Sequence, residues 1–565
     1  MKLFHEFIPK SILSLRHGYN FKIFRKDVLA GITVGIISLP LAMAFAIASG
    51  TTPDRGLVTA IVAGFLVSAL GGSRVQIGGP TGAFVVLIYG IIQRSGYEGL
   101  AASTLVAAVI LVLLGVFRLG TWIKYVPHPL IMGFTTGLAV LIFSTQIKDF
   151  FGLRMGTPPV DFIEKWVSYF YAFPTFDPLP LAVAGATLAA IILIRIHIPK
   201  IPWAIAAIVL STVICWAFDL PVPTIQSKFG QIPHNLPVPH FPSISIPEGK
   251  LAETFMNGFS IAFLGAIESL LCCVIADGMI GGRHKSNCEL VGQGIANFAS
   301  VLFGGLPATG AIARTAANIK TGAETPVAGM VHAATLFVII LCFAPIVSQI
   351  PLAALAAVLM MVAWNMSEIG HFFRLLKSPV GDVAILAAAF LLTVFVDITV
   401  AITFGMVLAS FVFMKRMSVY SRTVSLTQGF RERGGEFLER SDLNAISKRT
   451  IPEGVEVYEI QGPFFFGAAD LLKDVMSHFM APPKVFILRM RHVPMVDASG
   501  MHALKEFFEN CRRRNTILLL SGIHTQTQKD LEAFGFVGLI GKQRIFPHID
   551  AALAKAAELV ESPNS

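Results

Sequence analysis

Long apolar runs separated by short polar clusters fill the chain as far as Arg416. A run of about 20 apolar residues is typical of a helix that crosses a bilayer. Two of the runs, 80–93 and 309–319, are too short to cross alone. The pattern predicts a polytopic α-helical membrane protein with about fourteen segments in two groups of seven. These segments are 28–49, 56–71, 80–93, 99–117, 127–147, 180–197, 202–217, 254–277, 288–304, 309–319, 325–345, 351–365, 381–396 and 398–414.

The pattern changes after Arg416, where the chain becomes polar. Strands are predicted over 455–460, 484–490 and 515–520, and helices over 497–507, 526–534 and 550–560. Strands that alternate with helices are typical of a small α/β domain with a mostly parallel sheet. We therefore expect an N-terminal segment (1–27), a membrane domain (28–416), a linker (417–454) and an α/β domain (455–565).

Composition and charge agree with a membrane protein. Hydrophobic residues make up 54% of the chain and charged residues 14%, which is unlike a soluble globular protein. The net charge of +9 does not indicate a nucleic-acid partner, because the Lys and Arg residues gather at the ends of apolar segments. Such clusters mark cytoplasmic ends. With an even number of segments, both termini are expected in the cytoplasm and loops 148–179 and 218–253 outside.

The N-terminus carries no cleavable signal in this interpretation, because the first apolar run starts near Val28 and is too long. The expected location is therefore the inner membrane of a bacterium, with the chain crossing the lipid bilayer many times.

The two groups of seven contain matching motifs. Residues 69–84 and 302–312 each indicate a helix end, a short extended strand and the start of a short helix. Ser38 and Glu268 occupy equivalent positions. Because seven is odd, the second copy enters from the opposite side, so the repeats are inverted. Inverted repeats with broken helices place a binding site at the midplane, between two helix N-termini that attract an anion.

Small residues in these motifs could serve helix packing alone. Two copies at matching places favour a binding site over packing.

Two charged residues lie inside apolar segments. Glu268 sits in the middle of 254–277, and Arg314 lies in 309–319. A charge at that depth costs roughly 2.5–3.5 kcal/mol on insertion scales and usually serves an ion or proton pathway. One acid and one base in a membrane bundle predict a transporter for an anion. No arrangement of nucleophile and base indicates an enzyme, no cofactor is expected, and His492 and His502 are expected to be surface or capping residues.

Together these residues resemble the SulP sulfate-permease family with its C-terminal STAS domain. The resemblance covers nearly the whole chain and rests on residues 39–46, 78–81, 265–271, 284–287, 289–294 and 314–318. Residues 271–272, 277–279 and 361–368 look most like a bacterial C4-dicarboxylate transporter of that family.

The resemblance implies a seven-plus-seven inverted repeat with a core and a gate domain, a homodimer, and an anion held between the third and tenth helices. The site residues that it implies are Leu41, Phe45, Thr81, Gly82, Ala83, Ala313 and Arg314. Glu268 matches a carboxylate of proton-coupled members and a sodium-ligand aspartate of a bicarbonate-transporting relative. Cys272 replaces a sodium-binding threonine of that relative, and Arg314 replaces a glycine, so both differences count against sodium coupling.

We therefore expect proton-coupled uptake of C4-dicarboxylates such as succinate, fumarate and aspartate, with Glu268 as proton carrier. Burial favours the neutral form of a carboxyl group and a nearby cation favours the charged form, so changing occupancy of the site could move a proton. The alternative is a static Glu268–Arg314 ion pair that only braces the core domain.

Other functions stay open at this point. The cargo could be sulfate or bicarbonate, since backbone N–H groups select for negative charge and not for a particular acid. A nucleobase permease usually carries a second acid on the tenth segment, where this chain has Arg314. A membrane-tethered regulatory scaffold without transport is the alternative from another class. In the STAS domain, Ser499 matches a serine that is phosphorylated in anti-sigma-factor antagonists, but a role in dimer stability or in binding a cytoplasmic partner protein is expected instead.

Overall fold

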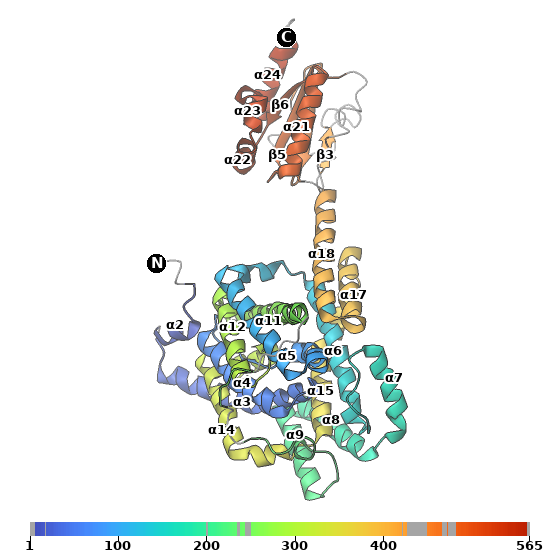
Figure 1. Cartoon of the computed structure of the whole chain (residues 1–565). Helices are drawn as coiled ribbons and strands as arrows, with labels where there is room; N and C mark the ends of the chain where they lie inside the picture. The colour runs from blue at the N-terminus through green and yellow to red at the C-terminus, as the bar shows by residue number, and fades with distance from the viewer. Residues whose placement is uncertain are drawn as a thin grey trace. The chain divides into compact units, whose positions relative to one another are not determined.

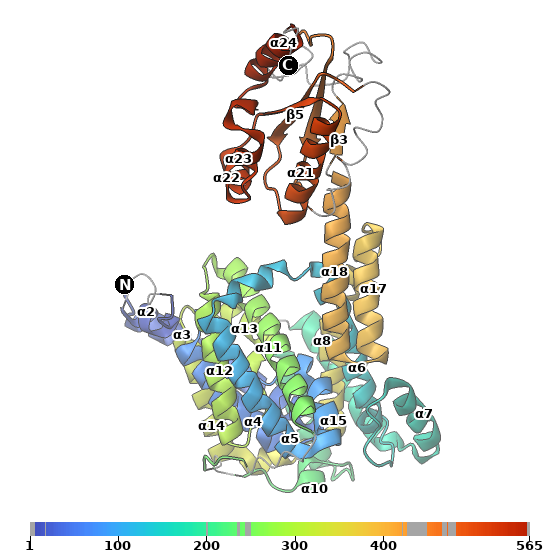
Figure 2. The same cartoon turned by 45° about the horizontal axis from the view of Figure 1, so that its top comes forward.

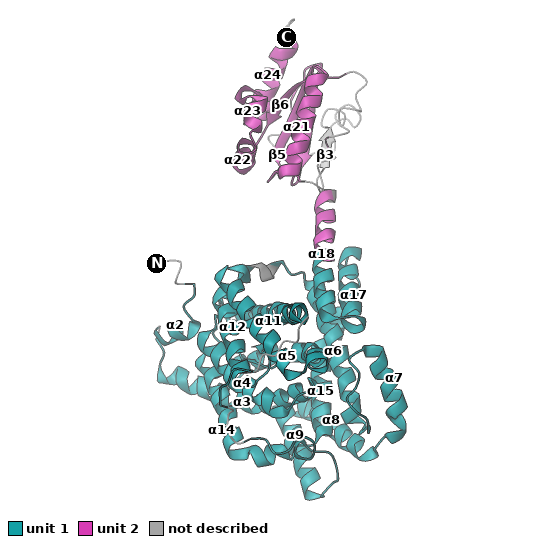
Figure 3. Ribbon diagram, in the orientation of Figure 1, with its two compact units in different colours: residues 1–407 teal, residues 408–565 magenta. Residues whose placement is uncertain are grey.

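The computed structural model describes residues 6–16, 18–198, 202–233, 238–242, 250–420, 422–425, 449–465, 472 and 482–561. The chain forms two compact units, residues Met1–Val407 and Leu408–Ser565 (Figure 3). The first is helical and the second is an α/β domain (Figure 1).

Helices dominate the first unit. In the described part of the chain, nine helices are long and apolar enough to cross a membrane. The first half contributes α3 (Phe21–Ala48), α4 (Pro53–Leu70), α5 (Gly82–Val116), α6 (His128–Phe150), α8 (Pro178–His197) and α9 (Trp203–Ala217). The second half contributes α11 (Leu251–Ile280), α12 (Ser286–Leu302), α13 (Ile312–Lys320), α14 (Val327–Ser348), α15 (Leu352–Ser367), α17 (Val380–Phe395) and α18 (Ile398–Tyr420). Shorter helices are α2 (Lys10–Arg16), α7 (Phe162–Ala172), α10 (Ile225–Phe229) and α16 (Ile369–Leu375).

These helices match the predicted segments, with one difference at a helix end. Segments 80–93 and 99–117 share the label α5, but the backbone is not helical at Gly96, with φ 66° and ψ −173°, so they are two helices as predicted. Helix α3 starts at Phe21 because Asn20 caps it by accepting a hydrogen bond from the amide of Ile23. The polar first turns of α3 therefore lie before the apolar run that marks the membrane segment.

One helix lies in the stretch 148–179, which was predicted as a loop. Helix α7 is only 11 residues long, and the residue before it, Asp161, caps it: its carboxylate accepts hydrogen bonds from the amides of Ile163 and Glu164. Its polar and apolar positions alternate with helical spacing, as in a helix that lies on a surface.

The membrane helices pack as two groups, which correspond to the predicted core and gate domains (Figure 2). In the core group, α3, α4, α5, α11, α12, α13 and α14 contact one another. In the gate group, α15 packs on α6, α8 and α9, and α17 packs on α6. Small residues allow close packing: a Cβ at Gly31 of α3 would lie 2.5 Å from the carbonyl oxygen of Ala328 in α14.

Two short strands join the halves of the core group. Strand β1 (Gly78–Gly79) precedes α5, and β2 (Thr309–Gly310) precedes α13. They pair antiparallel, with Gly78 opposite Gly310 and Gly79 opposite Thr309. The predicted order of helix end, extended strand and new helix is therefore present in both halves.

The second unit is an α/β domain with one five-stranded sheet. Its strands follow the order β3–β4–β5–β6–β7, and all pairs are parallel except β3 with β4. The strands are β3 (Arg422–Ser425), β4 (Val455–Gln461), β5 (Val485–His492), β6 (Ile517–Ser521) and β7 (Ile545–Phe546). In the described part of this unit, the helices that follow the strands are α21 (Ala498–Arg513), α22 (Thr525–Ala533), α23 (Phe536–Ile540) and α24 (Ile549–Glu561). The mostly parallel α/β domain is thus confirmed.

Alternate residues of the strands face opposite sides of this sheet. Phe486, Leu488 and Leu520 pack with residues of α21, α22 and α23 on one face. Val457, Ile487 and Leu519 pack with α24 on the other face. Strand β3 lies within the stretch expected as a linker, most of which falls outside the described residues.

Candidate functional site

Two helices begin on either side of the β1–β2 pair without side-chain caps. The residue before α5 is Thr81, whose hydroxyl is buried and has no hydrogen-bond partner in the described part of the chain. The residue before α13 is Ala311, which has no capping group. The first amides of a helix have no acceptor within the helix. Both helix starts therefore offer N–H groups and a positive dipole end to an anion.

The start of α5 is enclosed by apolar side chains from three other helices. A Cβ at Gly82 would lie 3.3 Å from Cδ1 of Ile142, 3.4 Å from Sδ of Met366 and 3.4 Å from Cε1 of Phe45. Helices α6 and α15 of the gate group thus close against the core group at this point. Leu41 shares a buried apolar cluster with Phe45 and Ile142.

The predicted site residues are not all enclosed to the same degree. Leu41, Phe45 and Ala83 are buried, and Thr81 is 9% exposed. Ala313, in the first turn of α13, is exposed. Ile142 and Met366 were not among the predicted residues, because an apolar side chain in an apolar segment carries no sequence signal of its own.

Arg314 crosses from the second half of the chain to the first. Its Nη2 donates a hydrogen bond to the carbonyl oxygen of Pro80, two residues before α5. Its Nη1 is buried and has no hydrogen-bond partner among the described residues. A Cβ at Gly79 would lie 2.8 Å from this Nη1, so the guanidinium lies against the glycine backbone. A buried cation therefore stands beside the start of α5.

Glu268 lies near the middle of α11 and is 7% exposed. Among the described residues no hydrogen bond and no ion pair to Arg314 is found for Glu268 in this structure. The other buried acids of the described membrane helices differ. Asp27 accepts hydrogen bonds from the amides of Glu324 and Thr325. Glu289 accepts them from the amides of Gly72 and Ser73 and from the side chain of Gln293.

Polar side chains next to Glu268 fasten α11 to strand β2. The hydroxyl groups of Ser269 and Thr309 are 2.7 Å apart, and Ser269 Oγ accepts a hydrogen bond of 3.0 Å from the amide of Gly310. Gln76 donates to the carbonyl oxygen of Ser269 at 3.5 Å and accepts from Cys273 at 2.6 Å. These contacts of neighbouring residues therefore hold Glu268 beside the β1–β2 pair.

Thr315 connects α13 to β1 and to α11. Its hydroxyl accepts a hydrogen bond of 3.0 Å from the amide of Ile77 and one of 3.2 Å from the thiol of Cys272. Sequence reasoning named neither Thr315 nor Gln76 or Ser269 as part of the site. Their signal was available, since each is a polar residue inside or beside an apolar run.

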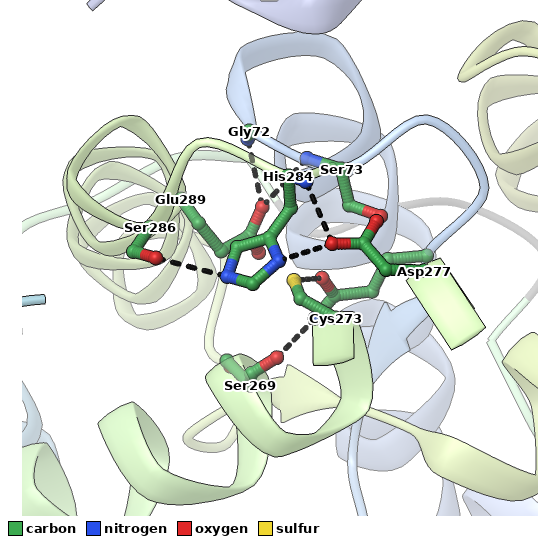
Figure 4. Close-up of polar contacts among 9 residues, drawn as sticks. Gly72, Ser73, Ser269, Cys273, Asp277, His284, Ser286 and Glu289 are labelled. Atoms are coloured by element: carbon green, nitrogen blue, oxygen red, sulfur yellow. Dashed lines mark hydrogen bonds and ion pairs between the residues drawn. The ribbon is translucent and has the colours of Figure 1, made fainter. Parts of the chain in front are cut away.

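A second polar cluster closes the turn between α11 and α12 (Figure 4). One carboxylate oxygen of Asp277 lies 2.7 Å from Nδ1 of His284 and 2.8 Å from its backbone amide. Ser286 Oγ lies 2.9 Å from Nε2 of His284. In the same view, Glu289 accepts hydrogen bonds from the amides of Gly72 and Ser73. These contacts tie the turn after α11 and the turn after α4 to α12.

Ser499 lies in the first turn of α21 and is exposed. Asp497 caps this helix by accepting a hydrogen bond of 2.7 Å from the amide of Gly500. His492, which was expected at the surface, is exposed and lies 2.8 Å from a carboxylate oxygen of Glu459.

Comparison with known proteins agrees with this architecture. Residues 24–389 match the sulfate permease family, and residues 447–552 match the STAS domain. The putative sulfate transporter YvdB of Bacillus subtilis is 41% identical over 94% of this chain and 98% of its own. The bicarbonate transporter BicA of Synechocystis is 28% identical over 98% of this chain and 99% of its own.

Solved structures have the same fold. The murine Slc26a9 anion transporter in the inward-facing state aligns with 99% of this chain over 95% of its own length. The TM-score is 0.85 and the sequence identity is 18%. The transmembrane domain of a cyanobacterial BicA aligns with 69% of this chain over 98% of its own length. The TM-score is 0.60 and the sequence identity is 27%. Because the family match spans the membrane unit and the relatives span nearly the whole chain, this protein belongs to the sulfate permease family of multi-pass membrane anion transporters and carries a C-terminal STAS domain.

Proposed function

We propose that the protein is a proton-coupled importer of a small dianion. The observation that carries this proposal is the combination of two uncapped helix starts with the buried guanidinium of Arg314 beside one of them. Three positive elements around one point favour a doubly charged anion over a singly charged one. The bound anion would accept hydrogen bonds from the first amides of α5 and α13, near Thr81, Gly82, Ala83 and Ala313.

Among dianions, sulfate and the C4-dicarboxylates are the two candidates. The name of the relative YvdB favours sulfate. The C4-dicarboxylates rest on the resemblance of residues 361–368 alone, and the relatives reported above are named sulfate or bicarbonate transporters. Bicarbonate, which is singly charged near neutral pH, is the alternative cargo because of the BicA relatives.

Glu268 is the proposed proton carrier. A buried carboxylate without donors is costly when charged, which suits Glu268 to carry a proton through the cycle. A dianion bound in the neighbouring site would favour the protonated form of Glu268 further, because like charges repel, whereas water that replaces the anion after its release would lower the cost of the charge and allow the proton to leave. Proton and dianion would then cross together.

The remaining expectations belong to the same proposal. The protein would work as a homodimer in a bacterial inner membrane with both termini in the cytoplasm. The STAS domain would stabilise this dimer or bind a cytoplasmic protein. Ser499 is accessible for phosphorylation, and loss of phosphate labelling in Ser499→Ala would be required to assign it a regulatory role.

The first test is uptake of labelled sulfate and labelled succinate into proteoliposomes, with and without an inward proton gradient. Gradient-driven uptake of either dianion supports the proposal and names the cargo. Uptake of bicarbonate alone would overturn the preference for a dianion. A folded protein that takes up none of the three would favour the scaffold without transport.

The Glu268→Gln variant tests the coupling. We expect uptake to persist while its stimulation by the proton gradient is lost, because glutamine cannot release a proton. Glu253→Gln is the matched control, since Glu253 lies in the first turn of the same helix and is only partly buried. Uptake by Glu268→Gln that still follows the gradient would contradict the role of Glu268.

A further inference from the structure

The gate group contains a large apolar groove that no part of the proposed transport cycle uses. The groove has a volume of about 1100 Å³ and lies between α6, α7, α8 and α15. Its walls include Phe143, Phe151, Trp166, Leu188, Ile192 and Trp364. None of the candidate anion-site residues lines it. It is therefore a separate site and not an extension of the anion pathway.

Arg195 is the one charged side chain among the residues that line the groove. Its Nη1 lies 3.1 Å from the amide oxygen of Asn365 and 3.0 Å from Sδ of Met361, and its guanidinium lies 5.9 Å from the ring of Trp203. In the described part of the chain no carboxylate lies within ion-pair distance of it. A cation with only neutral neighbours at the wall of an apolar groove can bind an anionic group.

Apolar side chains at the rim of the groove are exposed at the surface of the membrane unit. Phe143 and Ile192 are 42% and 43% exposed, and Ile196 and Trp364 are 67% and 64% exposed. Lipid chains can enter such a groove from the side and fill its irregular walls. The rigid surface of a second protein would need a matching ridge, whereas an acyl chain adapts its shape.

Helix α7 is suited to the membrane interface at the other end of the groove. Trp166, Tyr169 and Phe170 from α7 line the groove, and Phe170 and Tyr171 are 79% and 78% exposed. Aromatic residues are enriched where a membrane protein meets the headgroup region. Arg195 lies in the last turn of α8, which the proposed topology puts toward the cytoplasmic leaflet, where anionic lipids are concentrated.

We propose that this groove binds an anionic phospholipid, with the phosphate at Arg195 and an acyl chain along the apolar walls toward α7. Because Arg195 is positively charged, the site should prefer a lipid with net negative charge. A bound lipid of this kind would join α6, α8 and α15 and so stabilise the gate group.

Lipid retention measures the binding. The full-length protein is reconstituted with an equal mixture of phosphatidylglycerol and phosphatidylcholine and extracted in mild detergent. Native mass spectrometry then measures which lipid stays bound and in what amount. We expect the wild type to keep phosphatidylglycerol in preference. Arg195→Gln should reduce that preference about fivefold, which corresponds to the ~1 kcal/mol that one basic residue contributes to anionic lipid binding. Arg154→Gln, which changes an exposed arginine outside the groove, is the control.

A second variant tests the apolar wall. Ile192→Trp should fill the groove and displace both lipids, while Ile214→Trp, at a comparably exposed position on α9 outside the groove, should not. Unchanged lipid retention in Arg195→Gln and Ile192→Trp would overturn the proposal. Loss of a dimer in Ile192→Trp with unchanged lipid retention would also overturn it, since the occupant would then be a second copy of the chain.

Discussion

At the residue scale, the buried carboxylates of the membrane unit divide by their hydrogen bonds. Asp27 is fully buried and accepts hydrogen bonds of 2.8 and 3.1 Å from the amides of Glu324 and Thr325, before α14. Backbone amides that point at a carboxylate stabilise its charged form. Asp27 thus holds a turn in place as a fixed charge, whereas Glu268 lacks such donors among the described residues. Burial alone would not have distinguished the two.

This difference predicts opposite effects on stability. Asp27→Asn should lower the free energy of unfolding by about 1–2 kcal/mol, because charge-assisted hydrogen bonds become neutral ones. Glu268→Gln should leave stability unchanged or raise it, since no donor is lost. Thermal unfolding of the detergent-purified variants, followed by tryptophan fluorescence, measures both. Equal losses in the two variants would mean that Glu268 is a structural residue.

At the element scale, the apolar runs predicted the membrane helices well because a membrane-spanning helix needs a long run whatever it packs against. The paired strands were also predictable, since glycine motifs recur at matching places in both halves. The contacts between elements were not. Nothing in the sequence indicates that Arg314 reaches Pro80 or that Ser269 binds Thr309, because helical spacing fixes a face and not its partner. The amphipathic α7 was missed because it is only 11 residues long, too short for a membrane segment.

Helix α7 gives a prediction about pH. Lys165 is 1% exposed on this helix, and burial lowers its pKa to about 8, although the charge of Asp161 acts in the opposite direction. Between pH 8 and about 10.4, the usual lysine value, the unfolded chain holds the proton that the folded chain has lost. Stability should therefore rise with pH in this window by up to roughly 1.4 kcal/mol per unit, and stay flat below it.

Other lysines also titrate in this range, so the comparison is with Lys165→Met. This variant should be more stable at pH 7, and its melting temperature should rise less between pH 8 and 10. Parallel pH profiles for the two proteins would show that Lys165 is already solvated in the folded state. The measurement is the melting temperature in detergent at each pH.

At the scale of the whole molecule, the two compact units carry separate natural reporters. All five tryptophans, at positions 122, 166, 203, 216 and 364, lie in the membrane unit. Cys511 is the one cysteine of the second unit and is fully buried there, so burial raises its thiol pKa to about 12. Tryptophan fluorescence therefore follows one unit, and labelling of Cys511 follows the other.

These reporters can test whether the units unfold independently. Glu459 is buried in the second unit and accepts contacts of 3.1 Å from Arg489, 3.3 Å from Arg491 and 2.8 Å from His492. Removing its charge in Glu459→Gln should cost about 3 kcal/mol in that unit. In a Cys342→Ser background, which removes the exposed thiol, Cys511 should react at a lower temperature while the tryptophan transition stays in place. A shift of both transitions together would show one cooperative molecule.

The pairing of β1 with β2 makes the membrane unit sensitive to length. Three of the four paired residues are glycines, so the crossing depends mainly on how many residues lead into each helix. One residue inserted between Gly79 and Pro80 would rotate Thr81 away from its position and separate Arg314 from the carbonyl of Pro80. The same insertion in an exposed loop would be absorbed. The number of residues between the β1–β2 pair and each helix therefore limits which variants fold as much as the identity of those residues does.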